Sequence, residues 1–313
     1  MGDANPRIVV TPPAFCRSAV LRQELSRGFS RVVFNERDRY LSEPELIAFL
    51  QQADAAIVGR DPVSERVVGA LPELKMIAKY GVGLDNIDQE ALGRHGVNLG
   101  WAAGVNRRSV AELALCFMIG LCHKVFAGGF ALKGKVWQKD GGVQLTGKTV
   151  GIIGCGHVGG EVIRLLAPFG CRVLVRDILD KTDFCRRNRA ETAGLDDLIA
   201  QSDIVSLHVP LTESTRGMID ENVLRRMKPS AFLINTSRGE VVGLAALKKA
   251  LCEGFIAGAG LDVFPEEPPG DHELLNLPNL MVTPHIGGNT GEAVEAMGRA
   301  AIRHLEQFFR RAK

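Results

Sequence analysis

Three polar loops in the second half of the chain carry side chains that suit one kind of acid–base chemistry. Arg238 lies in the segment Asn-Thr-Ser-Arg-Gly, Glu266 and Glu267 lie in a loop flanked by prolines, and His285 lies in Thr-Pro-His-Ile-Gly-Gly. A guanidinium grips a carboxylate through two parallel hydrogen bonds. An imidazole exchanges protons near neutral pH, and a carboxylate on its second nitrogen fixes the tautomer. Together such groups would bind an alcohol that bears a carboxylate and take its proton.

Each of these residues also has an ordinary structural interpretation. Arg238 alone would be a solvated turn residue, and His285 a polar cap for the last helix. The two glutamates would form an exposed acidic loop. However, the three loops follow three successive apolar runs, at Ala231–Asn235, Ala257–Leu261 and Leu280–Thr283. Because functional groups in α/β sheets gather at the carboxyl ends of strands, loops in this order favour a shared site.

Oxidation of an alcohol needs a hydride acceptor, and a glycine-rich turn in mid-chain suits one. The motif Gly154-x-Gly156-x-x-Gly159 lies between an apolar run, Lys148–Ile153, and a helical pattern, Glu161–Ala167. In this setting the first glycine permits a tight turn, the second lets the backbone approach a pyrophosphate, and the third lets helix and strand pack closely. The amides that open the helix then face the phosphates. The alternative is a structural glycine turn in another α/β protein.

The form of the dinucleotide follows from the next strand. The apolar run Cys171–Val175 is followed by Asp177, eighteen residues after Gly159. An acidic side chain at this distance meets the ribose hydroxyls and repels the additional phosphate of NADP. We therefore expect NAD, while the neighbouring Arg176 leaves NADP open.

The composition is that of an ordinary globular protein. A length of 313 residues exceeds what one core usually supports, which favours two domains. With 24% charged residues and a formal net charge of +2, there is no electrostatic case for a nucleic acid or a membrane surface as partner. The apolar run Val110–Leu121 is too short to span a bilayer. Seven cysteines without a C-x-x-C pair favour reduced thiols in a cytoplasm, and no residue spacing suggests a metal site.

Apolar runs alternate with helical patterns along the chain, which predicts parallel sheets with helices on both faces. In the first hundred residues we expect strands at Ile8–Thr11, Arg31–Phe34, Ala55–Val58, Met76–Lys79 and Val97–Leu99, and helices at Ala19–Leu25, Glu45–Gln52, Glu65–Ala70 and Asp88–Arg94, with Ser64 and Asp88 as caps. After Asp177 we expect a further strand at Ile204–His208 and helices at Leu195–Ala200, Glu221–Arg226, Leu244–Leu251 and Thr290–Arg310.

One long helix is expected from Ser109 to Phe126. It is apolar around more of its circumference than a surface helix should be. It is therefore either a core helix of the monomer or a helix buried against a second subunit, and the second possibility would imply a homodimer.

Taken together, these motifs resemble the D-isomer-specific 2-hydroxyacid dehydrogenase family, and particularly its phosphoglycerate dehydrogenase branch. The segments 79–88, 106–112 and 145–150 are also similar to that family, so the resemblance covers nearly the whole chain. It implies an α/β protein of two doubly wound parallel-sheet domains. A Rossmann NAD-binding domain, at 102–285, would be inserted in a flavodoxin-like substrate domain built from 1–101 and 286–313.

The resemblance also implies a role for particular residues. Arg238, Glu267 and His285 would be catalytic, with Glu267 preferred to Glu266 because it stands five residues after Asp262 in the family's D-x-F-x-x-E-P pattern. The cofactor would be lined by Gly154, Gly156, His157, Val158, Gly159, Asp177, Thr236, Ser237, Arg238, Asp262, His285, Gly287 and Gly288, with Asp262 beside the nicotinamide amide. The substrate would be bound by Arg60, Val82, Gly83, Asn106 and Arg238.

The implied activity is NAD-dependent interconversion of a D-2-hydroxy acid and its 2-oxo acid. D-3-phosphoglycerate, and with it serine biosynthesis, is the first expectation, although only Arg60, Lys79 and Arg107 or Arg108 offer themselves to a phosphate. Hydroxypyruvate and glyoxylate are the alternatives. A non-catalytic NAD-sensing protein that resembles the C-terminal-binding co-repressors is another class, against which the complete catalytic trio argues.

Two further features bear on assembly and regulation. Trp137 resembles a tryptophan that reaches the active site of a neighbouring subunit, and it is equally well explained as a packing aromatic. The sequence stops at Lys313 without the serine-binding domain found in many relatives of that branch, so we expect no serine feedback of that kind.

Overall fold

The computed structural model describes residues 5–139 and 141–311, which form two compact α/β units. The discontinuous unit comprises Met1–Asn106 and Gly288–Lys313, and the inserted unit comprises Arg107–Gly287. The sequence had suggested boundaries after residues 101 and 285. A helix begins at Arg107, and the Ser109 hydroxyl donates to the Gly287 carbonyl, so both ends of the inserted unit are fastened to each other.

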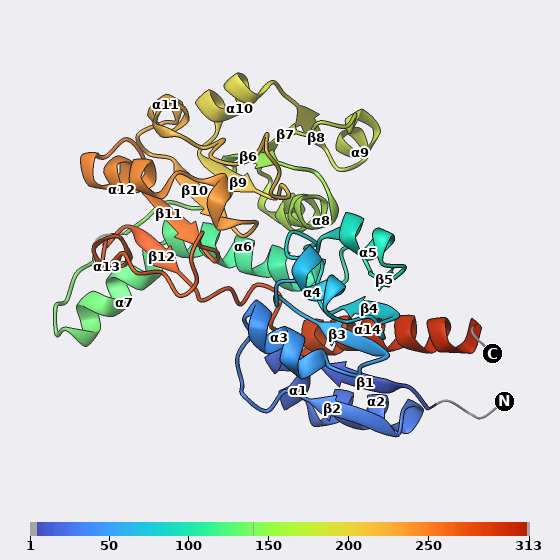
Figure 1. The fold of residues 1–313 in the computed structure, drawn as a ribbon. Helices are drawn as coiled ribbons and strands as arrows, with labels where there is room; N and C mark the ends of the chain where they lie inside the picture. Colours follow the sequence, from blue (N-terminus) through green and yellow to red (C-terminus); the bar gives the residue numbers. More distant parts are fainter. Residues whose placement is uncertain (1–4, 140, 312–313) are drawn as a thin grey trace. The chain divides into compact units, whose positions relative to one another are not determined.

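The discontinuous unit is built on a five-stranded parallel sheet (Figure 1). Its strands are β1 (Arg7–Val10), β2 (Arg31–Phe34), β3 (Ala55–Val58), β4 (Met76–Lys79) and β5 (Asn98–Gly100), in the spatial order β2-β1-β3-β4-β5. This is the flavodoxin-like order, in which the chain reverses its winding direction between β1 and β3. The predicted fold class is confirmed for this unit.

Helices cover both faces of the five-stranded sheet. One face packs on α3 (Glu43–Leu50), α4 (Glu65–Gly69) and α5 (Gln89–Arg94), and the other on α1 (Pro13–Arg17), α2 (Ala19–Gly28) and α14 (Gly291–Arg311). The expected caps are present, because the Ser64 hydroxyl accepts from the Val67 amide and the Asp88 carboxylate from the Ala91 amide. The last helix, far away in sequence, thus completes a core that the first hundred residues leave open.

The inserted unit is built on a seven-stranded parallel sheet. Its strands are β6 (Thr149–Ile153), β7 (Arg172–Arg176), β8 (Ala190–Thr192), β9 (Ile204–Leu207), β10 (Phe232–Asn235), β11 (Gly258–Leu261) and β12 (Leu280–Val282), in the spatial order β12-β11-β10-β9-β6-β7-β8. The winding reverses between β6 and β9, the usual place for a dinucleotide in a Rossmann sheet. The predicted Rossmann architecture is confirmed.

Two helical layers enclose this sheet. On one face lie α6 (Arg107–Cys122), α8 (His157–Leu166) and α9 (Thr182–Arg187), and on the other lie α10 (Leu195–Gln201), α11 (Glu221–Arg226) and α12 (Leu244–Glu253). The remaining elements are α7 (Val125–Lys133), α13 (His272–Leu275) and the short 3-10 turns η1 (Ala167–Phe169) and η2 (Gly239–Val241). The sequence did not predict α9, β8 or α13, which are short and carry weak patterns.

The expected single helix Ser109–Phe126 is wrong at its C-terminal end. Helix α6 stops at Cys122, Lys124 takes a left-handed conformation with φ of +53°, and α7 continues at 64° to α6. The apolar pattern does not end at this bend, so periodicity alone had no signal for it. Within residues 5–139 and 141–311, a membrane-crossing length of apolar helix is reached only when α6 and α7 are counted together.

Candidate active site

The loops that follow β11 and β12 bring an imidazole and a carboxylate together. The Nδ1 atom of His285 lies 2.9 Å from Oε1 and 3.0 Å from Oε2 of Glu267, and both side chains are partly shielded from solvent. The Oε1 atom of Glu267 also accepts from the Phe264 amide at 3.1 Å, which holds the carboxylate in place. Because Nδ1 contacts Glu267, Nε2 is the ring nitrogen that would exchange a proton with a substrate.

A second carboxylate shapes the turn that presents His285. Asp262 is 2% exposed, and its Oδ1 accepts from the Thr283 hydroxyl at 2.6 Å and from the Ile286 amide at 2.8 Å. Its Oδ2 accepts from the Gly287 amide at 2.8 Å. These bonds bracket His285, whose φ of +55° is unusual for a residue with a side chain. Burial raises the pKa of Asp262, while these donors act in the opposite direction.

The third loop, after β10, holds the guanidinium. The Asn235 side chain accepts from the Ser237 amide at 3.0 Å and the Ser237 hydroxyl at 2.8 Å, and donates to the Arg238 carbonyl at 2.8 Å. These bonds fix the backbone at Arg238, and the half-buried guanidinium donates from Nη1 to the Ser237 carbonyl at 2.7 Å. At Gly239 an added Cβ would lie 2.0 Å from the Phe264 carbonyl carbon, so this loop packs directly on the loop that carries Glu267.

The glycine turn has the shape that a dinucleotide requires. Gly154 has φ of +93°, and an added Cβ at Gly159 would lie 2.0 Å from the Gly154 carbonyl oxygen. At Gly156, by contrast, an added Cβ would meet nothing within 4 Å, so the backbone borders open space where a pyrophosphate would lie. Helix α8 begins at His157 and continues through Val158 without a side-chain cap, which leaves its first amides to donate hydrogen bonds to phosphate oxygens.

Asp177 follows β7 and is tied to the glycine turn. Its Oδ2 accepts from the Cys155 amide at 2.6 Å, and its Oδ1 from the Leu179 amide at 2.8 Å. Each oxygen keeps acceptor capacity for a ribose hydroxyl. Burial raises the pKa of the Cys155 thiol to about 11, which matches a small packing residue rather than a reactive thiolate.

An orphaned polar atom adds to this fit. The Thr236 hydroxyl is buried, and within residues 5–139 and 141–311 it has no hydrogen-bond partner. It lies in the same loop as Arg238, directly after β10, the strand adjacent to β9. A buried hydroxyl without a partner costs free energy, which a bound polar ligand would recover.

The expected substrate residues Arg60, Val82, Gly83 and Asn106 belong to the discontinuous unit. The Arg60 guanidinium lies 5.5 Å from the centre of the Tyr40 ring, and the Val82 carbonyl accepts from the Trp101 indole at 3.0 Å. The Gly288 backbone, expected near the cofactor, packs against Asn106 in this same unit. A joint site of these residues with His285 stays a prediction.

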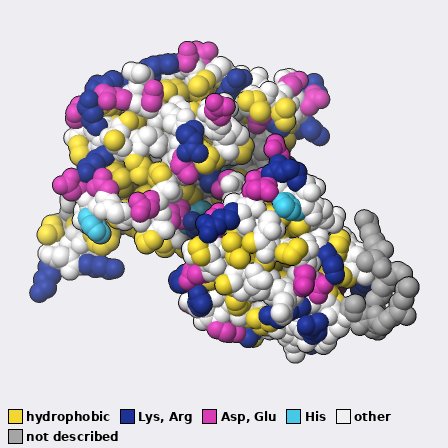
Figure 2. All heavy atoms as spheres, in the orientation of Figure 1, with side chains coloured by type: hydrophobic (Ala, Val, Ile, Leu, Met, Phe, Trp, Pro, Cys, Tyr) yellow, Lys and Arg dark blue, Asp and Glu magenta, His cyan; other side chains and the backbone are white. Residues whose placement is uncertain are grey.

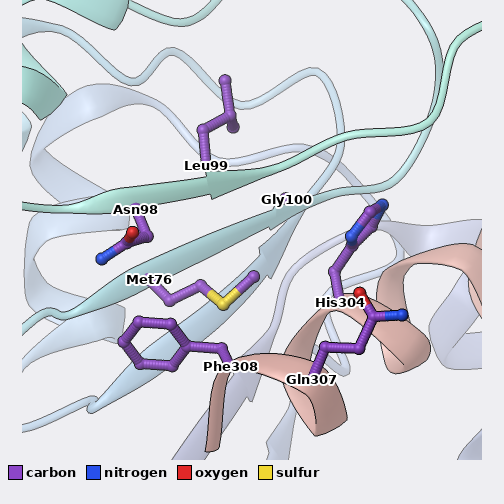
Figure 3. A pocket seen from close by; sticks show the side chains of 7 residues that line it. All are labelled: Met76, Asn98, Leu99, Gly100, His304, Gln307 and Phe308. Carbon is purple, nitrogen blue, oxygen red and sulfur yellow. The ribbon is translucent and has the colours of Figure 1, made fainter. Parts of the chain in front are cut away.

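A hollow of about 410 Å³ in the discontinuous unit is a different feature (Figure 3). It lies between β5 and α14 and is lined by Met76, Asn98, Leu99, Gly100, His304, Gln307 and Phe308. It is therefore separate from the loops that follow β10, β11 and β12. In the described parts of the chain, no group of three or more His, Cys, Asp or Glu side chains is placed to hold a metal ion.

Sequence reasoning missed some of the residues that build this site. Asn235 and Thr283 were expected only as strand ends, and their roles appear once the loops are folded. Both stand directly beside motif residues, and that position was the only available signal. Trp137 has 77% of its surface exposed, so a packing role within its own unit is excluded by the structure.

Comparison with known proteins points in one direction. The family model "D-isomer specific 2-hydroxyacid dehydrogenase, NAD binding domain" matches residues 115–287. The chain is 38% identical over 308 residues to a glyoxylate reductase of Korarchaeum cryptofilum, covering 94% of this chain and 93% of that protein. It is 36% identical over 266 residues to a D-3-phosphoglycerate dehydrogenase of Mycobacterium tuberculosis, covering 83% of this chain and 50% of that protein.

Solved structures agree with the sequence comparison. A glyoxylate reductase from Paecilomyes thermophila has a TM-score of 0.83 at 27% identity, covering 96% of this chain and 94% of that one. A D-lactate dehydrogenase from Aquifex aeolicus, complexed with NAD and lactic acid, has a TM-score of 0.84 at 26% identity, covering 97% of each chain.

Proposed function

The chain belongs to the D-isomer specific 2-hydroxyacid dehydrogenase family and is an NAD-dependent oxidoreductase, and on this basis we propose that it reduces a small 2-oxo acid of the glyoxylate and hydroxypyruvate kind. The observation that carries the choice of substrate is similarity along nearly the whole length of glyoxylate reductases. The alternative reading as a non-catalytic NAD sensor gives way to this enzyme assignment.

The bound cofactor supplies the hydride, and the side chains manage the rest of the reaction. Arg238 binds the carboxylate of the acid and polarises its carbonyl. His285, protonated, gives the proton on Nε2 to the carbonyl oxygen as C2 accepts the hydride, so the 2-oxo acid becomes the 2-hydroxy acid. Glu267 on Nδ1 stabilises the ring while it is charged. Oxidation runs through the same steps in reverse.

Contacts inside the protein also favour a substrate without a phosphate. Lys79, a candidate phosphate partner, is only 4% exposed, and its ammonium donates to the Gly59 carbonyl and the Asn86 side chain. Arg108, another candidate, pairs with Glu112 at 2.6 Å and Glu161 at 3.0 Å.

D-3-phosphoglycerate is the second candidate substrate. It is favoured by Arg60 and by the similarity to D-3-phosphoglycerate dehydrogenases. Arg60 stands over Tyr40 with its guanidinium carbon 5.5 Å from the ring centre, and a planar cation of this kind suits a phosphate.

A substrate panel decides between the two candidates. NADH oxidation is followed at the nicotinamide absorbance band with glyoxylate, hydroxypyruvate and 3-phosphohydroxypyruvate, and NAD reduction with D-3-phosphoglycerate. We expect kcat/KM for glyoxylate or hydroxypyruvate to exceed that for the phosphorylated acid by roughly tenfold or more, about 1.4 kcal/mol. The reverse ranking would transfer the proposal to D-3-phosphoglycerate, and turnover of none of these acids would contradict it.

We also propose a homodimer, with its contact surface displaced from the one expected. Most of α6 is buried within the inserted unit itself, against α8. A group of exposed apolar side chains lies on α7 and just after it, including Phe126, Phe130 and Trp137, while others, such as Ile178 and Leu179, lie elsewhere. Figure 2 shows hydrophobic side chains on the surface of the molecule. The group on α7 borders a hollow of about 1020 Å³ lined by the end of α6, by α7 and by residues 275–282. An apolar arm beside an apolar hollow suits a second copy of the chain.

A cytoplasmic location is likewise proposed. All seven cysteines are free thiols in the structure. Free thiols persist in a reducing compartment, which supports this location.

A further inference from the structure

A row of buried polar side chains lies at the carboxyl edge of the five-stranded sheet. Thr11 follows β1, Asn35 follows β2, Asp61 stands in the loop after β3, and Lys79 ends β4. Thr11 and Asp61 are 0% exposed, Asn35 is 2% exposed and Lys79 is 4% exposed. A carboxylate and an ammonium are costly to bury unless their hydrogen bonds are satisfied. These side chains lie at the edge where α/β sheets bind ligands, and their burial requires that each is hydrogen-bonded.

The ammonium of Lys79 joins two loops. It donates to the Gly59 carbonyl, in the loop after β3, and to Oδ1 of Asn86, in the loop after β4, at 2.8 Å. The Asn86 amide completes the link by donating to the Gly59 carbonyl at 3.0 Å and the Asp61 carbonyl at 2.6 Å. The buried Lys79 ammonium and the Asn86 side-chain amide therefore link residues 59–61 to residues 81–86.

Asp61 and Asn35 extend the network to the segment that supports Arg60. The Asp61 carboxylate accepts from the Leu41 amide at 2.8 Å and from the Thr11 hydroxyl. The Asn35 amide donates to the Arg39 carbonyl at 2.8 Å. These bonds fix residues 39–41 and thereby the ring of Tyr40, over which the Arg60 guanidinium lies.

The loop after β4 leads directly into the expected binding backbone. Gly81 has φ of +111°, a conformation that few other residues adopt, and it stands two residues after Lys79. Val82 and Gly83 follow, and the Trp101 indole holds the Val82 carbonyl at 3.0 Å. Both segments that are expected to touch the acid thus start from the atoms that Lys79 connects.

We propose that Lys79 is a positioning residue for the acid: its buried ammonium joins loop 59–61 to loop 81–86 and holds Arg60 and the backbone of Val82 and Gly83 in one arrangement that receives an anionic substrate. This inference rests on the proposed reduction of a 2-oxo acid. Preorganised groups bind more tightly because less ordering remains to be done on binding. Lys79 therefore acts on substrate affinity and leaves the hydride step alone.

The test compares two lysines of the same segment. Lys79→Met keeps most of the side-chain volume and removes the charge. Lys75→Met is the matched control, because Lys75 lies just before β4, has a side chain 59% exposed and pairs with Asp54 at 2.6 Å. Steady-state kinetics give KM for glyoxylate and kcat, and quenching of protein fluorescence gives Kd for NADH, which binds in the inserted unit.

For Lys79→Met we expect KM for the oxo acid to rise roughly tenfold, while kcat and the NADH Kd change by less than about twofold. Lys75→Met should match the wild type in all three values. Equal KM values for the two variants, or a fall in kcat with KM unchanged, would overturn the inference. Failure of the wild type to reduce any 2-oxo acid would contradict the proposed function instead.

A second variant covers the case in which Lys79→Met does not fold. Asn86→Ala removes the amide that shares the Gly59 carbonyl with Lys79, at a position that is only half-buried. It should raise KM for the oxo acid in the same way. An unchanged KM for a folded Asn86→Ala variant would also overturn the proposal. Where both variants fold, their double mutant should show less than the sum of the two effects, because both act through one link.

Discussion

At the scale of single residues, the proposed reaction depends on how the imidazole of His285 is held. Glu267 contacts its Nδ1 atom, while Asp262 accepts from the Thr283 hydroxyl before His285 and from the Ile286 and Gly287 amides after it. The two carboxylates come from one loop and have different tasks. The first acts on the charge and tautomer of the ring, and the second on the conformation that presents it. Two substitutions separate these tasks.

Glu267→Gln removes the charge and keeps the shape. A neutral amide stabilises the positive charge on the ring less than a carboxylate does, so proton transfer through His285 should slow. We expect kcat of reduction at neutral pH to fall roughly 10- to 100-fold. The measurement is steady-state kinetics of the forward reaction. A kcat equal to that of the wild type would show that the pair has no role in proton transfer.

Asp262→Asn tests the turn. An asparagine has one acceptor oxygen, and its amide group would meet a backbone N–H where Asp262 now accepts. We expect the free energy of unfolding to fall by about 1–3 kcal/mol and kcat to fall with it, because His285 loses its fixed conformation. Urea unfolding and steady-state kinetics give both values. Full activity together with reduced stability would show that the hydrogen bonds of Asp262 are not needed for catalysis.

At the scale of elements, three strands of the discontinuous unit form with the predicted bounds, namely Arg31–Phe34, Ala55–Val58 and Met76–Lys79. The last two are buried along their whole length, and a parallel strand covered on both sides is a continuous apolar run in the sequence. The first is a partly exposed edge strand. The prediction of one helix Ser109–Phe126 was wrong because an apolar run does not by itself reveal whether its residues are buried. Apolar residues continue past its end onto α7, where they are exposed, and composition cannot distinguish the two environments.

The candidate site was predictable in its residue types and unpredictable in its supports. Arg238, Glu267 and His285 follow strands in order, and a pattern of that kind is visible in the sequence. The partners of Asp262 are two backbone amides and the Thr283 hydroxyl, all more than twenty residues away, which no motif displays. Lys79 was visible only as a possible phosphate ligand, because burial is a property of the folded chain.

The residue after β9, His208, packs against the glycine turn, and its burial predicts a pH dependence of stability. His208 follows this strand, its Nε2 lies 2.9 Å from the Ser206 hydroxyl, and its Nδ1 is shielded from solvent. An added Cβ at Gly154 would lie 2.5 Å from the His208 carbonyl oxygen. Burial lowers the pKa of His208 to about 3, so the folded protein keeps this ring neutral.

The buried His208 ring makes the free energy of unfolding fall at acidic pH. The unfolded chain gains a proton on His208 as the pH falls below about 6.5, and the folded chain does not, so stability is lost as the pH falls from there toward 3. In His208→Gln this loss should be absent. Between pH 7 and pH 5 its unfolding free energy should decrease by about 2 kcal/mol less than that of the wild type. Equal decreases in urea titrations at the two pH values would mean that the ring titrates in the folded state.

At the scale of the whole molecule, two α/β units divide the work of the proposed enzyme. The inserted unit contains the glycine turn and the trio, and the discontinuous unit contains the residues proposed to receive the acid. The exposed apolar residues of α7 belong to the inserted unit. Assembly through this arm would therefore leave each copy with its own cofactor turn and trio.

Phe130→Asp tests the proposed dimer. The Phe130 side chain is 71% exposed on α7, so a charge there costs the isolated chain little and costs a buried interface much. We expect light scattering to report a dimer for the wild type and a shift toward the monomer for the variant. Val20→Asp, at a 43% exposed apolar site of α2, should remain dimeric. A wild type that is monomeric at all concentrations would refute the arrangement.

The place of α14 in the fold has a consequence for biosynthesis. The apolar side chains of Ala301 and Leu305 complete one layer of the five-stranded sheet, although they lie about two hundred residues after its last strand. A ribosome therefore releases that sheet with one face covered by α1 and α2 alone, and goes on to deliver the inserted unit. Only when the final helix emerges can the first strands become fully protected. Nascent chains halted before residue 291 should accordingly be bound by chaperones through their oldest segment.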